Sequence, residues 1–257
     1  MNIGFIGVGH MGSSLAKTIK DYKDCYLYLN DVVNEKAILL NKEIVNSKVA
    51  SIETIINECE YIFIGVKPSD ADEVVKLINN DKPVIISMVA GKTIKDINNL
   101  INNPIIRILP NTPVLVKSGL TLYNYSSKVN KEALDKFLDF MKETGEVTQV
   151  KEIDINSISV VTGSAPAYLD YFIDALIKAL MKKGIKEKEA TDYALKMALG
   201  TIKLDLASNK TPLELGKEVC SPNGSTIEGV NVLLANDLYD VVDEAFNATF
   251  NKNNKIN

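Results

Sequence analysis

The sequence predicts a doubly wound α/β domain with a mostly parallel sheet over residues 1–152 and an all-helical domain over residues 153–257. Three observations support this prediction. In the first part, apolar runs typical of buried strands alternate with helical patterns, as in a parallel sheet that is covered on both faces. A glycine-rich turn joins the first apolar run to the first helical pattern. After residue 154 the periodicity is helical, without a convincing strand.

The glycine-rich turn at residues 7–12, Gly-Val-Gly-His-Met-Gly, follows the apolar run 3–6 and precedes a helical pattern. A strand, a G-x-G-x-x-G turn and a helix in this order form a dinucleotide-binding fingerprint. Gly7 permits the tight turn, Gly9 lets the backbone approach a pyrophosphate, and Gly12 lets the helix lie close to the strand. The free N–H groups at the helix start favour phosphates. We therefore expect a dinucleotide cofactor here, with His10 and Met11 in the same loop. An ordinary glycine-rich turn is the alternative.

The second predicted strand, residues 25–30, ends at Asn30 and is followed by Asp31, 19 residues after Gly12. The fingerprint places an acidic residue about 20 residues on, where it bonds the 2′-hydroxyl of the adenosine ribose. A carboxylate at this position repels a 2′-phosphate, so Asp31 favours NADH over NADPH. Two alternatives stay open: Asp31 could cap the next helix, residues 33–42, and Asn30 could form the hydrogen bond without a charge.

Three further apolar runs, at residues 60–66, 83–89 and 104–109, are separated by helical patterns at 70–78 and 93–100. In a parallel sheet, ligands lie beyond the carboxyl ends of the strands. We therefore expect the loops after these runs to border the cofactor. The expected contacts are Val66, Lys67, Pro68, Ala90, Gly91 and Asn111. Ordinary turns also use Pro and Gly, and a lysine at a strand exit such as Lys67 is often simply solvated.

Strands at residues 119–123 and 145–150 and a helix at 131–142 complete the first domain. In the helical domain, a broad apolar stripe starts at residue 155 and is interrupted at residues 162–168, Thr-Gly-Ser-Ala-Pro-Ala-Tyr. Pro166 lacks an N–H and should clash with the carbonyl of Thr162, which kinks the helix. The small residues beside it would let another backbone or a flat ring come close, and we place Ser164 among the expected cofactor contacts. A plain crossing of two helices is the alternative.

A polar turn at residues 220–229, Cys-Ser-Pro-Asn-Gly-Ser-Thr-Ile-Glu-Gly, opens another predicted helix. Ser225 and Glu228 match the S-x-x-E capping box. Free N–H groups at a helix start also bind carboxylates, and the hydroxyls of Ser221, Ser225 and Thr226 lie beside them. The turn could therefore hold a small carboxylic acid, with one hydroxyl bonding a second polar atom of that acid.

Composition excludes several classes of protein. The net charge is −4 and no block of Lys or Arg occurs, which argues against nucleic-acid or polybasic membrane binding. No apolar run approaches the ~18 residues of a membrane span. The chain begins directly with a strand, so we expect no signal peptide, and three widely spaced cysteines indicate the cytoplasm. His10 is the single histidine, which excludes a His-dependent triad or a multi-histidine metal site, and we expect no metal.

Three stretches resemble the pyrroline-5-carboxylate reductase family: residues 3–12, residues 107–113, and the pair formed by 162–168 and 221–227. The resemblance implies reduction of 1-pyrroline-5-carboxylate, a cyclic imino acid, to L-proline by NADH or NADPH. It implies an N-terminal Rossmann domain and a helical domain that interlocks with a second copy in a homodimer, which can stack further into a decamer. It also implies a substrate loop that holds the carboxylate through backbone N–H groups. The implied substrate-binding residues are Ser221, Asn223, Gly224, Ser225 and Thr226, with Thr226 as the catalytic partner of the ring nitrogen.

The sequence departs from this family at two positions, because Ala165 and Asn223 each stand where the family usually has glycine. Asn tolerates a left-handed backbone better than most residues, so the loop around Asn223 can keep its shape. Ala165 adds a methyl group where backbone and ligand are expected to be crowded.

Two other functions stay open. The first stretch also resembles β-hydroxyacid dehydrogenases, which use a catalytic lysine on a helix after the Rossmann domain, but residues 163–168 contain no lysine. A non-catalytic NAD-binding protein is the other alternative, supported only by the two departures. In the reductase interpretation, hydride goes to C5 of a protonated imine that is already electrophilic. Catalysis is then mostly proximity and orientation, with Thr226 as the hydrogen-bond partner of the nitrogen.

Overall fold

The computed structural model describes residues 1–254 and confirms the predicted fold class, a mostly parallel sheet with helices on both faces followed by a set of helices. The chain divides into two compact units. The first comprises residues 1–163 together with the C-terminal segment from Phe250, and the second comprises Ser164–Thr249.

The described residues of the first unit form an eight-stranded sheet in the order β3-β2-β1-β4-β5-β6-β7-β8. The strands are β1(Asn2–Ile6), β2(Tyr26–Asn30), β3(Ser47–Val49), β4(Tyr61–Ile64), β5(Val84–Ser87), β6(Ile105–Leu109), β7(Gly119–Tyr125) and β8(Gly145–Gln149). Neighbours from β3 to β6 are parallel, β7 is antiparallel to β6, and β8 is parallel to β7. The strand order reverses at β1, which lies between β2 and β4. A reversal of this kind is where open α/β sheets bind their ligands.

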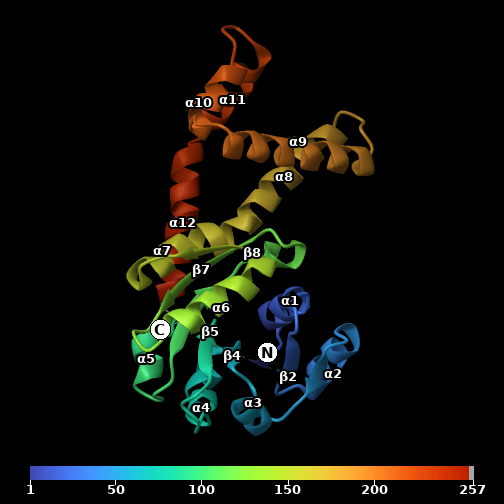
Figure 1. Ribbon diagram of the computed structural model, residues 1–257. Helices are drawn as coiled ribbons and strands as arrows, with labels where there is room; N and C mark the ends of the chain where they lie inside the picture. The colour runs from blue at the N-terminus through green and yellow to red at the C-terminus, as the bar shows by residue number, and fades with distance from the viewer. Residues whose placement is uncertain (255–257) are drawn as a thin grey trace. The chain divides into compact units, whose positions relative to one another are not determined.

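Helices cover both faces of the sheet, as Figure 1 shows. One face carries α1(His10–Ile19), α2(Asn34–Glu43) and α6(Lys131–Met141), and the other carries α3(Ile52–Glu58), α4(Ala71–Lys76) and α5(Ile94–Asn98). Because side chains alternate along a strand, β1 and β4 contribute to both cores. Phe5 stacks on Phe63 in one core with ring centroids 4.6 Å apart, and Ile6 and Ile64 point into the other.

The sheet unit contains two elements that the sequence did not predict, β3 and α3. β3 has only three residues and α3 only seven, so neither is long enough to show a clear period. Short 3-10 turns connect the regular elements: η1(Pro68–Asp70), η2(Thr112–Val116), η3(Lys142–Thr144) and η4(Glu152–Asp154).

The interruption that Pro166 predicts is present, but it lies just before the proline. α7(Ile155–Ser159) runs into a π-helical turn, η5(Val160–Ser164), and α8(Ala165–Met181) begins directly after it, with Pro166 in its first turn. Proline is over-represented at the start of a helix. The remaining helices are α9(Glu187–Ala207), α10(Pro212–Val219), α11(Ser225–Ala235) and α12(Leu238–Asn254). The sequence did not predict α10.

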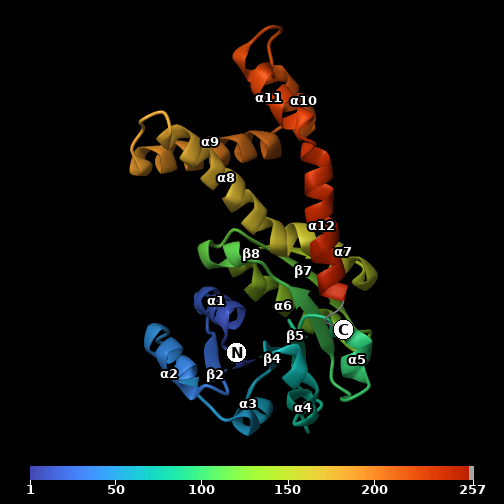
Figure 2. The same cartoon turned by 180° about the vertical axis from the view of Figure 1, so that it is seen from behind.

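In the second unit, α8 packs against α9, as the view in Figure 2 shows. The hydroxyl of Tyr168 on α8 contacts the Ala245 carbonyl at 3.3 Å and the Thr249 hydroxyl, so it ties α8 to α12. The last helix of the described residues, α12, extends to Asn254.

Candidate active site

The glycine-rich loop has the geometry that the sequence predicts. Gly7 adopts a positive φ of 94°, and a Cβ there would lie 2.6 Å from the carbonyl oxygen of Gly65. A Cβ at Gly12 would lie 2.3 Å from the Gly7 carbonyl oxygen, so glycine is needed for α1 to approach the strand. A Cβ at Gly9 would meet no protein atom within 4 Å. Packing therefore does not require glycine at position 9, and the open backbone there fits a pyrophosphate.

The start of α1 can hold an anion. Its N-cap is Gly9, no side chain caps it, and its first turn contains no acidic residue. The leading N–H groups therefore keep their partial positive charge for a ligand. His10 is exposed, and its carbonyl accepts hydrogen bonds from the Ser13 and Ser14 hydroxyls.

A cleft of about 510 Å³ lies beside this loop at the carboxyl ends of β1, β2 and β4. It brings together six of the predicted cofactor residues: Gly7, Gly9, Asn30, Asp31, Val66 and Lys67. It also contains side chains that the sequence analysis missed: Val32, Lys36, Ile52, Asp70, Glu73 and Val74. Val32 and Lys36 follow β2, and Asp70, Glu73 and Val74 follow β4. Ligands lie beyond the carboxyl ends of parallel strands, so these residues could have been predicted by including the starts of the following helices. Ile52 belongs to α3, which was not predicted.

Asp31 joins the glycine loop to the segment before α2. Its Oδ2 accepts the N–H of Val8 at 2.9 Å, and its Oδ1 accepts the N–H of Val33 at 2.9 Å. The N-cap of α2 is Val33, which has no side-chain cap, so Asp31 is not the N-cap of that helix. The neighbouring Asn30 donates to the Ala50 carbonyl at 2.8 Å. Each carboxylate oxygen of Asp31 keeps a lone pair that can accept a ribose hydroxyl.

The other predicted cofactor residues do not line this cleft, and their contact with a cofactor stays a prediction. They are His10, Met11, Gly12, Pro68, Ala90, Gly91, Asn111 and Ser164. Gly91 adopts a positive φ of 78° in the turn after β5. The Asn111 amide is bonded at both ends: Nδ2 donates to the Thr162 carbonyl at 3.0 Å, and Oδ1 accepts the N–H of Leu120 at 2.8 Å.

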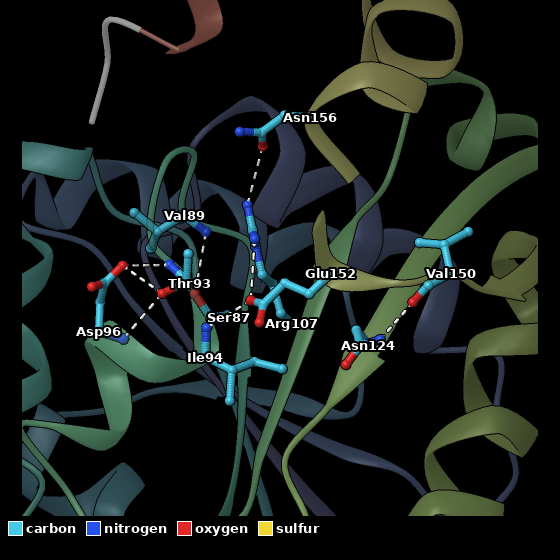
Figure 3. Close-up of polar contacts among 10 residues, drawn as sticks. All are labelled: Ser87, Val89, Thr93, Ile94, Asp96, Arg107, Asn124, Val150, Glu152 and Asn156. Carbon is cyan, nitrogen blue, oxygen red and sulfur yellow. Dashed lines mark hydrogen bonds and ion pairs between the residues drawn. The ribbon is translucent and has the colours of Figure 1, made fainter. Parts of the chain in front are cut away.

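A buried arginine on β6 contacts the segment that follows β8, as Figure 3 shows. Arg107 on β6 donates to Glu152 Oε1 at 3.2 Å and to Asn156 Oδ1 at 3.4 Å. The same Glu152 oxygen accepts the N–H of Ile94, the first residue of α5, at 2.7 Å. In the sequence, Arg107 stands out only as the first residue of the motif at residues 107–113. The signal that could have found its role is a charged residue inside an otherwise apolar strand, which needs a buried partner.

Beside this pair, Thr93 and Asp96 form a capping box at the start of α5, also drawn in Figure 3. The Asp96 carboxylate accepts from the Thr93 hydroxyl at 2.7 Å and from its backbone N–H at 2.8 Å. These hydrogen bonds lower the pKa of Asp96 below its ordinary value.

The predicted substrate loop is in the helical unit, and one expectation about it is wrong. α11 begins at Ser225 with Gly224 as its N-cap and no side-chain cap. Ser225 is therefore the first helical residue, and the capping box of Ser225 with Glu228 is not formed. This leaves the first N–H groups of α11 free of a side-chain acceptor at the cap.

The backbone of this loop explains two of its residues. Asn223 adopts a positive φ of 59°, which confirms that asparagine can take the left-handed position of a glycine. A Cβ at Gly224 would lie 2.3 Å from Ser221 Oγ, so only glycine fits there without movement of Ser221. The side chains of Ser221, Asn223, Ser225 and Thr226 are exposed around the helix start.

Within residues 1–254 no group of three or more His, Cys, Asp or Glu side chains is arranged to hold a metal ion. In that same range no helix is long and apolar enough to cross a membrane. The cysteines at positions 25, 59 and 220 are free thiols.

Comparisons with known proteins show similarity along the whole chain. A family model for pyrroline-5-carboxylate reductase dimerisation matches residues 152–256, and a model for coenzyme F420-dependent NADP oxidoreductase matches residues 2–91. A pyrroline-5-carboxylate reductase from Aquifex aeolicus is 28% identical over 259 residues, covering 100% of this chain and 97% of that relative.

Two solved structures are similar over almost their full lengths. The 1-pyrroline-5-carboxylate reductase of Streptococcus pyogenes matches with a TM-score of 0.92 and 27% identity, covering 99% of this chain and 98% of the other. The pyrroline carboxylate reductase of Plasmodium falciparum, solved with NADP bound, matches with a TM-score of 0.90 and 27% identity, covering 100% and 98%.

Proposed function

We propose that the chain is a pyrroline-5-carboxylate reductase, which reduces 1-pyrroline-5-carboxylate to L-proline with a nicotinamide cofactor. The main observation in support of this proposal is that the similarity to known proteins extends over both units. One family model covers the glycine loop, the other covers the substrate loop, and a full-length relative connects them. We propose residues 1–152 as the cofactor-binding domain and residues 153–257 as the domain for substrate binding and dimerisation.

In this proposal each loop binds one anionic group through the N–H groups of a helix start. The α1 start holds the cofactor pyrophosphate, and the α11 start holds the substrate carboxylate. The reduced nicotinamide supplies the hydride that C5 of the imine accepts. Thr226, in the first turn of α11, is the hydrogen-bond partner of the ring nitrogen. The chain orients a reactive imine that needs no strong acid, so its contribution is mostly positional.

We propose that NADH is preferred over NADPH. The argument rests on Asp31, whose carboxylate is held at the cleft by the N–H groups of Val8 and Val33 and would repel a 2′-phosphate. Lys36 and Lys67 line the same cleft and could attract one, but both are exposed, so water and salt screen their charges. One relative was solved with NADP, so the preference has to be measured with both cofactors.

We also propose that two copies interlock through their helical units, with a decamer as a further assembly. The match to a dimerisation model over residues 152–256 supports association of the chain with itself. A cytoplasmic location is a prediction from the free cysteines that cell fractionation would test.

The test is a reductase assay with 1-pyrroline-5-carboxylate and either NADH or NADPH, in which L-proline must appear in step with cofactor oxidation. Turnover on 3-hydroxy acids, without activity on the imino acid, would favour the β-hydroxyacid dehydrogenase alternative. Cofactor binding without turnover of either substrate would favour a non-catalytic NAD-binding protein.

A further inference from the structure

Pro166 removes one backbone hydrogen-bond donor from the segment that leads into α8. In a regular helix the N–H of residue 166 would donate to the carbonyl of Thr162, four residues earlier. Proline has no N–H, so residue 166 provides no donor for this carbonyl. Thr162 lies inside the π-helical turn η5, directly before α8 begins.

The side chain of Asn111 supplies that donor. Its Nδ2 donates to the Thr162 carbonyl at 3.0 Å, and its Oδ1 accepts the N–H of Leu120 on β7 at 2.8 Å. Only 9% of Asn111 is exposed. An amide that is buried and bonded at both ends has little freedom to move, so the Thr162 carbonyl is fixed relative to the sheet.

A second set of contacts holds the chain just before the turn. Arg107 bonds Glu152 and Asn156, as drawn in Figure 3, and Glu152 also accepts the N–H of Ile94. These contacts fasten residues 152–156 to β6 and α5. These contacts end at residue 156, and the Asn111 side chain bonds the turn itself.

We propose that Asn111 is a positioning residue for the reduction. It holds the η5 turn, which directly precedes α8, through the Thr162 carbonyl. This inference rests on the proposed reductase function, in which rate depends on bringing two bound molecules together, and small misplacements then reduce turnover strongly. It assigns Asn111 a role through the turn in place of the direct cofactor contact expected from the sequence.

The test is a double-mutant cycle between Asn111→Ala and Pro166→Ala. Asn111→Ala should lower kcat about tenfold, because it removes the side-chain donor to the Thr162 carbonyl, while the Kd for NADH measured by cofactor fluorescence stays the same. Pro166→Ala restores a backbone N–H that can donate to Thr162. In that background the loss caused by Asn111→Ala should shrink to about two- to threefold, because the two positions serve one carbonyl.

Asn103→Ala is the matched control. Asn103 is also buried, and its amide donates to the carbonyls of Asn80 and Pro83 at 2.9 and 3.0 Å, before β5 begins. Its loss should lower the melting temperature and leave kcat unchanged. If Asn111→Ala does not fold, Asn111→Asp keeps the acceptor for Leu120 and removes the donor to Thr162, and should show the same loss of kcat.

Hydrogen exchange provides a readout that does not depend on activity. Amides of residues 158–168 should exchange faster in Asn111→Ala and recover when Pro166→Ala is added. A chain without reductase activity that shows this exchange pattern would refute the proposed function and leave the coupling to the turn intact. A rise in the Kd for NADH that is equal in both backgrounds would overturn the inference and make Asn111 a cofactor ligand. Unchanged kcat and exchange would also overturn it.

Discussion

At the scale of single residues, the backbone determines the position of two residues of the proposed site. Asp31 is held by the N–H groups of Val8 and Val33, and Asn223 replaces a glycine in a left-handed position. Substitutions at such positions can separate a chemical role from a structural one when a shape-preserving variant is included.

Asp31→Asn should lower the ratio of kcat/KM for NADH to that for NADPH by about tenfold, because the amide no longer repels a 2′-phosphate. The ratio is the quantity to measure, since loss of one acceptor for Val8 or Val33 affects both cofactors alike. Glu35→Gln is the control, because it removes one charge from α2 at a residue outside the cleft lining. A ratio equal to that of the parent chain would contradict the assignment of Asp31.

Thr226→Ala should lower kcat about a hundredfold, the scale seen when one preorganised hydrogen-bond partner is removed from a reacting centre. Thr226→Ser keeps the hydroxyl and should retain most of the turnover, while the Kd for NADH should not change in either variant. Steady-state kinetics and cofactor titration together test this. Equal losses in the alanine and serine variants would indicate that the methyl group, and not the hydroxyl, is required.

At the scale of elements, helix starts carry most of the proposed chemistry, and the side chains near them decide what each can do. At the start of α5, Thr93 and Asp96 form a capping box, and the Glu152 carboxylate accepts the N–H of Ile94. The starts of α1 and α11 follow Gly9 and Gly224, which provide no side-chain cap. The capped helix supports the fold, and the two uncapped helices have N–H groups available for anions.

Thr93→Ala should lower the free energy of unfolding at pH 7 by about 1 kcal/mol, as expected for loss of a cap. The hydrogen bonds from Thr93 lower the pKa of Asp96, so their stabilisation is fully present above the ordinary pKa of Asp. It is lost as the pH falls through the lower pKa of the folded protein. The difference from the parent chain in urea unfolding should therefore be constant from pH 7 to about pH 5 and shrink below about pH 4.

Thr93→Ser is the control, because it keeps the hydroxyl and should stay close to the parent chain at every pH. A difference between the parent chain and Thr93→Ala that does not change with pH would show that the Asp96 carboxylate takes no part in the cap.

At the scale of the whole molecule, the two units differ in how much apolar surface they bury. The sheet unit has two continuous cores, whereas α8 and α9 bury only Ile173, Ala190 and Ala194 among their described side chains. Many large apolar side chains of the helical unit are exposed, among them Phe172, Tyr193, Leu199, Ile202 and Leu204. An exposed apolar surface of this kind is typical of an association surface, in agreement with the match to a dimerisation family.

Leu199→Lys, on α9, should weaken association of the chain, because it places a charge on the apolar surface that we propose to be covered by a second copy. Leu199 is 57% exposed, and Leu115 in the sheet unit is 48% exposed, so Leu115→Lys is a matched control. Light scattering after size-exclusion chromatography should show a smaller species at low concentration for Leu199→Lys only. The same molar mass for both variants and the parent chain would contradict the proposed interface on α9.

The elements and site residues that could be predicted are those that neighbouring residues in the sequence indicate. Strands β1, β2, β4, β5 and β6 have apolar runs, and Gly7 and Gly12 lie where backbone approach excludes a side chain. β3, α3 and α10 were missed because they are short. The capping box at Ser225 was predicted wrongly because Gly224 takes the N-cap in the folded loop, which makes Ser225 the first helical residue.

The sequence by itself determined the fold class, the glycine loop, the position of Asp31 after β2 and the substrate-loop motif, because each depends on neighbours in the chain. The tertiary structure decided which residues meet: Asp31 with Val8, Arg107 with Glu152, and Asn111 with Thr162. These pairs lie 23, 45 and 51 positions apart in the sequence. No local pattern encodes such pairs, since the folded sheet brings them together. The glycine loop thus follows from local sequence, and its connection to the rest of the site follows from the fold.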